Sequence, residues 1–242
     1  MTARLYVESP LAVGERVILP PGPAHHAAKV LRLRSGDPIV LFNGEGGEYS
    51  GRLASVSARE TIVELAAYAE PARESPLDLV LAQGISRGER MDYTLQKAVE
   101  LGVTTIVPLL TRRCTVQLED ERAARRLAHW RGVIVHACEQ SGRTRLPRLA
   151  PITTLEAFAD ARPGGTRLCL APDAAASLAR TPIDDRATIL VAGPEGGLEA
   201  AEIGTLSRAG FAAVRLGPRI LRTETAALVA LAILQSRAGD LA

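Results

Sequence analysis

Two glycine-proline loops in the last third of the sequence are the segments best suited to hold a ligand. One is Gly193-Pro194-Glu195-Gly196-Gly197, and the other runs from Gly217-Pro218 to Thr225. Each follows an apolar stretch that predicts a β-strand, and glycine allows the backbone to adopt positive φ and to approach a bound molecule closely. An isolated Gly-Pro pair usually makes only a turn. Two long, similar loops after consecutive predicted strands favour a binding site.

The order of residues in these loops disfavours the commonest nucleotide-binding sites. Neither loop fits the G-x-G-x-x-G pattern, and neither contains the Gly-Lys-Ser/Thr of a P-loop. A Rossmann dehydrogenase and a P-loop NTPase are therefore disfavoured. A third loop, Ala171-Pro172-Asp173, follows another predicted strand. Because the carboxyl ends of parallel strands share one edge of a sheet, we expect the three loops to meet there.

The cysteines and histidines do not have the spacing of a metal site. Cys114, Cys138 and Cys169 are odd in number and widely separated, and no CxxC pair occurs. We expect these three residues to be small hydrophobic members of the core, without a disulfide. The four histidines form no set of metal ligands either, so we expect no metal.

The charge balance is compatible with an RNA partner without requiring one. The net charge is +2, and Lys29 and Lys97 are the only lysines, so arginine supplies nearly all the positive charge. Arginine suits phosphate groups better than lysine does, but a GC-rich genome would produce the same bias. No apolar run is long enough to cross a bilayer, and Glu8 precedes any signal-peptide core. We therefore expect a cytoplasmic protein with no membrane partner.

The elements that must position these loops fall into two regions of different texture. From Arg4 to about Ala69, the pattern predicts short strands over residues 37–42, 51–56 and 61–65, with a hairpin turn at 43–47. We expect this region, residues 1–70, to form a small β-barrel domain. Residues 71–76 are polar and bounded by prolines, which predicts a linker.

Beyond the linker, strands and helices alternate over residues 77–242. Apolar stretches predict strands at 77–82, 103–110, 167–170, 188–191 and 212–216. Amphipathic stretches predict helices at 89–101, 119–138, 200–208 and 223–237. This alternation predicts an α/β domain with a parallel sheet covered by helices on both faces.

Four blocks of the sequence, in order, resemble the RsmE family of the SPOUT superfamily, whose members methylate N3 of a uridine in 16S ribosomal RNA. The blocks are His25-His26 with Val30 to Leu33 and Gly36-Asp37, then Gln96 to Val103, then His136 to Arg143, and finally Gly193 to Gly197 with Leu216 to Ala227. The loop after Leu170 is the weakest match, because it offers Asp173 where a nearby glutamate is common in the family.

The resemblance implies a SPOUT-type α/β domain with a C-terminal trefoil knot, preceded by a PUA-like β-barrel that binds RNA. It further implies S-adenosylmethionine as cofactor, 16S ribosomal RNA as substrate, free or in the assembled small subunit, and a homodimer. The apolar helix from Ala226 to Leu234 suits a dimer interface, and it suits the core of a monomer equally well.

The resemblance also assigns residues to the site. The cofactor would contact backbone and apolar groups of the three loops, namely Leu170, Ala171, Pro172, Gly193, Pro194, Glu195, Gly196, Leu216, Gly217, Ile220, Leu221 and Thr225. Arg222 is the candidate to stabilise the anion that forms when uracil N3 loses its proton. Glu224, or alternatively Glu195, would accept that proton, although each could instead cap a helix. Candidates for phosphate contacts are Arg32, Arg34, Arg87, Arg90, Arg143 and Arg145.

Two other functions stay open at this point. Another SPOUT methyltransferase would modify a ribose 2′-hydroxyl or a transfer RNA, and a non-catalytic assembly factor would bind RNA without turnover. The position of the methyl group distinguishes the first alternative from N3 methylation, and binding of S-adenosylmethionine distinguishes the second.

Overall fold

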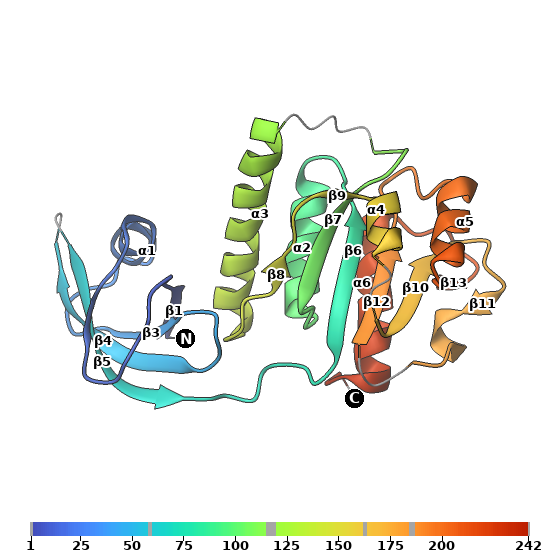
Figure 1. Cartoon of the computed structure of the whole chain (residues 1–242). Coiled ribbons are helices and arrows are strands. Elements are labelled where there is room, and N and C mark those ends of the chain that lie inside the picture. The colour runs from blue at the N-terminus through green and yellow to red at the C-terminus, as the bar shows by residue number, and fades with distance from the viewer. Residues whose placement is uncertain (1, 58–59, 115–119, 162–163, 184–186, 242) are drawn as a thin grey trace. The chain divides into compact units, whose positions relative to one another are not determined.

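The computed structural model describes residues 2–57, 60–114, 120–161, 164–183 and 187–241, and it divides into two compact units (Figure 1). The N-terminal unit comprises Met1–Glu74 together with Cys138–Leu146, and the C-terminal unit comprises Ser75–Ala137 and Pro147–Ala242. This division differs from a single cut at a linker, because a short segment from the middle of the chain belongs with the N-terminal unit.

A five-stranded sheet forms the N-terminal unit. Its strands lie in the order β1 (Ala3–Tyr6), β3 (Pro38–Phe42), β4 (Glu48–Val56), β5 (Thr61–Ala69) and β2 (Arg16–Ile18). Only the β1–β3 pair is parallel. Alternate residues point into a core that includes Leu5, Ile39 and Leu53. A short helix α1 (Pro21–His25) continues into a π-helical turn, η1 (His26–Val30). The three predicted strands and the hairpin turn are confirmed.

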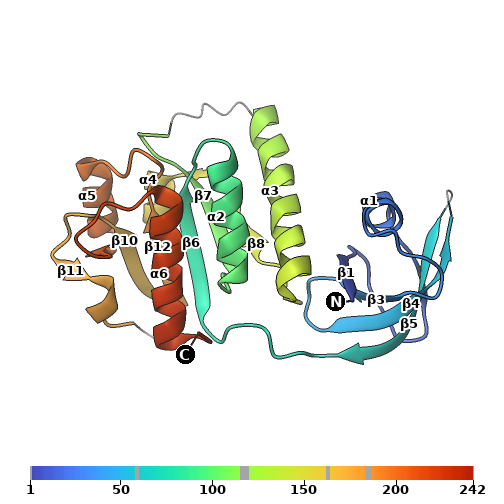
Figure 2. The same ribbon diagram turned by 180° about the vertical axis from the view of Figure 1, so that it is seen from behind.

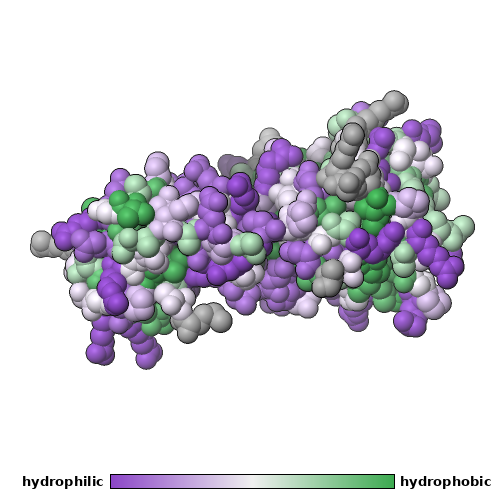
Figure 3. Space-filling model, turned by 90° about the horizontal axis from the view of Figure 1, so that it is seen from below, coloured by the Kyte–Doolittle hydropathy of each residue, from purple (hydrophilic) through white to green (hydrophobic). Residues whose placement is uncertain are grey.

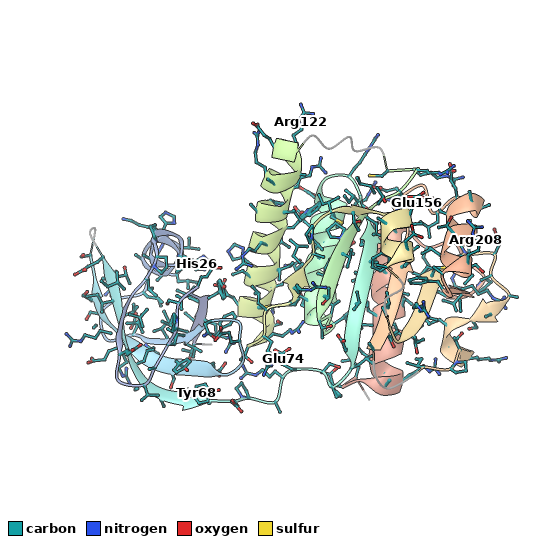
Figure 4. All side chains as sticks on the ribbon, viewed as in Figure 1. His26, Tyr68, Glu74, Arg122, Glu156 and Arg208 are labelled. Carbon is teal, nitrogen blue, oxygen red and sulfur yellow. The ribbon has the colours of Figure 1, made fainter. Side chains whose placement is uncertain are left out.

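The segment that returns from the middle of the chain is bound to the N-terminal unit by a buried ion pair. Glu74, labelled in Figure 4, accepts hydrogen bonds at Oε2 from Nε and Nη2 of Arg143, at 2.9 and 2.8 Å. Its Oε1 accepts from the backbone N–H groups of Thr144 and Arg145. Arg143 is only 5% exposed. The prediction that Arg143 contacts RNA is therefore corrected, because its guanidinium lies inside the unit with a carboxylate partner.

A parallel sheet forms the C-terminal unit. The order is β11 (Ala176–Ser177), β13 (Ala212–Arg215), β10 (Thr166–Leu170), β12 (Ala187–Ala192), β6 (Asp78–Gly84), β7 (Thr105–Leu110) and β8 (Arg148–Leu149), and β9 (Thr153–Thr154) also pairs with β7. Every pairing is parallel. The predicted α/β architecture is confirmed, with each predicted strand within two residues of an observed one.

Helices cover both faces of this sheet. Helices α2 (Glu89–Glu100) and α6 (Thr223–Ala238) pack together on one face, as Figure 2 shows, with α3 (Asp120–Ser141) beside α2. Helices α4 (Leu155–Asp160) and α5 (Ala200–Arg208) lie on the other face, and η2 (Leu178–Arg180) is a short 3₁₀ turn. The predicted start of α3, Glu119, lies outside the described residues.

The face of the molecule seen in Figure 3 carries both polar and apolar side chains. The most exposed large apolar residue is Ile220, at 88%. No described helix is long and apolar enough to span a membrane. Within the described ranges, no group of three histidine, cysteine or acidic side chains is arranged to hold a metal ion.

Candidate active site

Three loops leave the carboxyl ends of three neighbouring strands, β13, β10 and β12, and surround two adjoining cavities. The larger cavity has a volume of about 310 Å³ and the smaller about 50 Å³. Both cavities are lined by Leu170, Pro172, Leu221 and Ala226. The expectation that the three loops meet at one edge of the sheet is confirmed.

The smaller cavity is bordered mainly by apolar side chains and loop backbone. Its lining adds Ala171, Val214, Arg215, Leu216, Gly217 and Arg219 to the shared residues. The backbone of Gly217 has a φ of 151°, which a side chain at this position would disfavour. A planar, largely apolar group held by a few backbone hydrogen bonds would suit such a site.

The larger cavity is lined by the loop from Gly193 to Gly197. The first residue of this loop must be glycine, because other residues of the loop leave no space for a side chain there. A Cβ atom at Gly193 would lie 2.9 Å from the carbonyl carbon of Gly197 and from the nitrogen of Leu198. The loop therefore folds tightly back on itself, closed by a hydrogen bond from Gly197 N–H to the Pro194 carbonyl. We expected glycine here for approach to a ligand, whereas at Gly193 packing within the loop is sufficient reason.

A buried polar network fixes this loop to β6 and to the start of α6. Gln83, which is fully buried, donates from Nε2 to the carbonyl of Gly193 and to Oγ1 of Thr223, both at 3.2 Å. The Thr223 hydroxyl donates to the same Gly193 carbonyl at 2.6 Å. Buried hydrogen bonds of this kind hold a loop in one position.

Glu195 is the acidic residue of the loop, and it is engaged by three donors. Its Oε1 accepts from the backbone N–H of Arg87 at 2.8 Å and from Nη1 of Arg90 at 3.1 Å. Burial by itself would raise the pKa of Glu195, but the backbone N–H groups of Arg87 and of Glu195, together with the Arg90 guanidinium, outweigh it and lower the pKa. A carboxylate held ionised in this way is a weak proton acceptor, and it ties the loop to the residues just before α2.

The sequence pattern did not identify one charged residue of the larger cavity, Arg113. This residue lies in the loop after β7, at the same edge of the sheet, and it lines the cavity. Its Nη1 donates to the Gly196 carbonyl at 2.6 Å. The sequence did offer one indication of Arg113. It lies shortly after a predicted strand, as the other three loops do.

The remaining predicted site residues lie outside these two cavities. Thr225 is exposed and lines neither of them, and Arg222 is an exposed residue at the N-terminus of α6. Glu224 lines a different cavity of about 590 Å³, together with Tyr93 and Gln96 of α2 and His136 of α3. Its Oε2 is buried and has no hydrogen-bond partner among the described residues.

Five of the arginines proposed to contact phosphate are exposed. In the N-terminal unit these are Arg32, Arg34 and Arg145. In the C-terminal unit they are Arg87 and Arg90, and Arg90 also forms the ion pair with Glu195. The burial of Arg143 is the exception described above.

The chain matches known proteins over nearly its whole length. Residues 73–235 match the model of an RNA methyltransferase domain, and residues 24–65 match that of an RNA methyltransferase PUA domain. A ribosomal RNA small subunit methyltransferase E from Buchnera aphidicola is 31% identical over 239 residues, covering 98% of this chain and 97% of the relative. The chain belongs to the ribosomal RNA small subunit methyltransferase E family.

Solved structures support the same membership of the methyltransferase E family. A methyltransferase from Legionella pneumophila, in complex with S-adenosylmethionine, is 39% identical with a TM-score of 0.97, and the match covers 100% of both chains. A ribosomal RNA small subunit methyltransferase E from Neisseria gonorrhoeae, bound to S-adenosylmethionine, is 41% identical with a TM-score of 0.94, again over 100% of both chains. The family expected from the four sequence blocks and the PUA-like character of the N-terminal unit are confirmed.

Proposed function

We propose that this chain transfers the methyl group of S-adenosylmethionine to N3 of a uridine in 16S ribosomal RNA of the small subunit. The observation that carries the proposal is the meeting of three loops around the two adjoining cavities, in a chain whose relatives were solved with S-adenosylmethionine bound. In this reaction, N3 loses its proton, a carbon–nitrogen bond forms, and S-adenosylhomocysteine leaves.

The residues around the cavities fit this cofactor. Adenine requires an apolar surface and a few backbone groups, which Leu170, Leu216 and the backbone near Gly217 provide. Asp173, at the larger cavity, offers acceptors for ribose hydroxyls. The larger cavity falls at the lower end of the range for small-molecule sites, about 300–1,000 Å³. When bound, S-adenosylmethionine supplies an electrophilic methyl group on a positively charged sulfur.

The chain's own part in the chemistry is to orient the base and stabilise charge. We assign Arg222 to the uracil carbonyl that becomes negative as N3 is deprotonated. Of the two acidic candidates, Glu224 is the better proton acceptor, because the oxygen of Glu195 is already occupied by Arg87 and Arg90. Oε2 of Glu224 is buried and accepts no hydrogen bond from the described residues, which is consistent with a role in accepting the proton of uracil N3.

The decisive test is to map the modification. RNA from a strain that lacks this methyltransferase is incubated with the protein and S-adenosylmethionine, and the product is mapped by mass spectrometry. We expect the methyl group on N3 of one uridine in the small-subunit RNA. A methyl group on a ribose or on transfer RNA would show that the chain is a different RNA methyltransferase. Absence of both cofactor binding by calorimetry and turnover would identify a non-catalytic RNA-binding protein.

Arg222→Ala tests the assignment of charge stabilisation. Loss of a donor to a developing oxyanion costs about 10²- to 10³-fold in kcat. Because Arg222 lines neither cofactor cavity, we expect S-adenosylmethionine affinity to stay near the wild-type value. Full turnover by the variant with cofactor bound would remove Arg222 from the mechanism.

We propose that exposed arginines bind the phosphates of the RNA, and that the protein acts in the cytoplasm, where we expect its substrate. Arg32 and Arg34 in the N-terminal unit are both exposed and lie two residues apart. Replacing both with glutamine should weaken RNA binding and reduce the slope of log K against log salt by about 0.7–0.9 for each phosphate no longer neutralised. Replacing the ion-paired Arg16 provides a control, and equal slopes for all three proteins would contradict the assignment.

We also propose a homodimer. Helix α6 is apolar on all sides from Ala226 to Leu234, yet this stretch is fully buried only at Ala227, Ala230, Leu231 and Leu234. Val229 and Ile233 stay partly exposed in the single chain. Sedimentation should give twice the chain mass of 25.7 kDa, and Ile233→Asp should shift the protein towards the monomer. A wild-type monomer at micromolar concentration would contradict this proposal.

The trefoil knot completes the proposed fold. Helix α6 starts beside the loop after β12 and packs on α2, although the strand before it, β13, lies on the far side of β10. This path supports threading of the last segment past the loop that follows β12. An experimental structure whose backbone would straighten without a knot when its two ends are pulled apart would contradict this proposal.

A further inference from the structure

Arg113 is distinguished by its charge within the larger cavity. Among the described residues that line this cavity, it is the one with a positive charge, whereas Asp173 and Glu195 are acidic. The side chain of Arg113 is about half exposed, at 51%. A basic group at the mouth of an otherwise apolar and acidic cavity requires an explanation in terms of what the cavity binds.

The backbone around Arg113 is fixed on both sides. The preceding N–H, of Arg112, donates to Oε1 of Glu202 at 2.8 Å, and Glu202 is only 1% exposed. The N–H of Cys114 donates to the Thr111 carbonyl at 3.0 Å, which closes a turn around Arg113. The guanidinium is therefore carried by a loop with little freedom, a property of preorganised binding groups.

The guanidinium of Arg113 lines the cavity and has more N–H donors than its hydrogen bond with Gly196 uses. Nη1 donates to the carbonyl of Gly196, and Nε forms an ion pair with Oε1 of Glu199 at 3.7 Å, which is beyond hydrogen-bond distance. A guanidinium has five N–H donors in a planar fork that matches a carboxylate. The contact with Gly196 orients the group and leaves further donors for a ligand.

We propose that Arg113 binds the carboxylate of the methionine portion of S-adenosylmethionine. This inference rests on the proposed placement of the cofactor in the two cavities. The adenine is uncharged and suits the smaller cavity, so the charged end must lie in the larger one. There a carboxylate would be repelled by Asp173 and Glu195 and attracted by Arg113, whereas the positive ammonium and sulfonium groups would favour the two acids.

Decarboxylated S-adenosylmethionine provides the test, because it differs from the cofactor only in lacking the carboxylate. Binding of both compounds is measured by calorimetry to the wild type, Arg113→Gln, Arg113→Lys and the neighbouring control Arg112→Gln. We expect the wild type to prefer the intact cofactor by about 10- to 100-fold, the range of a charge-assisted hydrogen bond. Arg113→Gln should lose most of this preference, Arg113→Lys should keep part of it, and Arg112→Gln should keep all of it.

The outcomes separate this inference from its alternatives. A preference that survives in Arg113→Gln, or is absent from the wild type, would overturn it. An equal loss of affinity for both compounds would show that Arg113 only positions the loop at Gly196. Unchanged cofactor affinity with a raised KM for RNA would make Arg113 a phosphate contact. Failure of the wild type to bind either compound, or full binding by Leu221→Asp, would instead refute the proposed cofactor site.

Discussion

The carboxylate of Glu195 is surrounded by donors from two parts of the chain, and this arrangement makes stability depend on pH. Because the folded-state pKa lies below the usual 4.5, the ionised group stabilises the fold above pH 4.5, and this contribution is lost as the pH falls through the lowered value. Unfolding in urea should show a difference between the wild type and Glu195→Gln that is constant from about pH 5 to 8 and shrinks at lower pH. A difference that persists unchanged at pH 3 would contradict the assigned contacts.

The three cysteines should differ sharply in reactivity. Burial raises the pKa of Cys138 to about 12 and that of Cys169 to about 11, and both side chains are inside the fold. Cys114 is partly exposed. At pH 8, Ellman's reagent should modify one thiol rapidly in the native protein and three after unfolding, since the thiolate is the reactive form. Cys114→Ser should abolish the rapid phase, and rapid reaction of that variant would show that a buried cysteine is accessible.

At the residue scale, the sequence singled out loops that follow a predicted strand and contain glycine or proline. Leu170, Gly193 and Leu216, which belong to these loops or to the strand ends before them, line the two cavities. Arg113 was not singled out, because residues 111–119 contain neither glycine nor proline and its contact with the Gly196 carbonyl joins distant segments. Arg143 was wrongly expected on the surface, because nothing in the local sequence reveals that Glu74 faces it.

Helix α3 contains a glycine that no close contact requires. A Cβ atom at Gly132 would meet nothing within 4 Å, and its φ is not positive. Because glycine in the middle of a helix costs about 0.5–1 kcal/mol relative to alanine, Gly132→Ala should raise the free energy of unfolding by about that amount. Gly193→Ala is the matched comparison and should destabilise, since its Cβ would collide with backbone. Destabilisation by Gly132→Ala would indicate an unseen constraint on α3.

At the element scale, the long and strongly patterned segments were the predictable ones. Helix α5 was predicted with its observed bounds, and α6 differs by one residue at its end. Strands β1, β2, β8, β9 and β11 were not predicted; each has two to four residues, and among strands this short only β13 was predicted. The π-helical turn η1 was also missed, since its geometry arises from local packing that a hydrophobic pattern does not encode.

The ion pair of Glu74 and Arg143 joins segments about seventy residues apart, so it should affect the whole N-terminal unit. Glu74→Ala removes the carboxylate that pairs with the buried Arg143 guanidinium, and we expect a loss of about 3–5 kcal/mol in the free energy of unfolding. Glu64→Ala removes a partner of the exposed pair with Arg16 and should change stability by less than about 0.5 kcal/mol. Equal effects of the two changes in urea denaturation would show that burial of the pair carries no extra stability.

The division of the whole molecule was only partly predictable. The change of texture near residue 71 marks where the β-rich unit gives way to the α/β unit. No change of sequence pattern indicates that residues 138–146 belong to the N-terminal unit, because this segment begins within α3. Residues 138–146 contact Glu74, Arg4, Tyr6 and Gly44 of the N-terminal unit, and a local sequence pattern does not reveal contacts between distant segments.

The order of strands in the parallel sheet also determines when the molecule can be completed during its synthesis. Strand β6 begins at Asp78, but its neighbour β12 begins only at Ala187. During synthesis, one edge of the central strand β6 therefore stays without its partner β12 until a much later part of the chain has been made. Such long-range pairing is slow and prone to aggregation. A nascent chain cannot form the cofactor cavities before β12 and β13 have left the ribosome, so cofactor capture can follow synthesis but cannot guide its early stages.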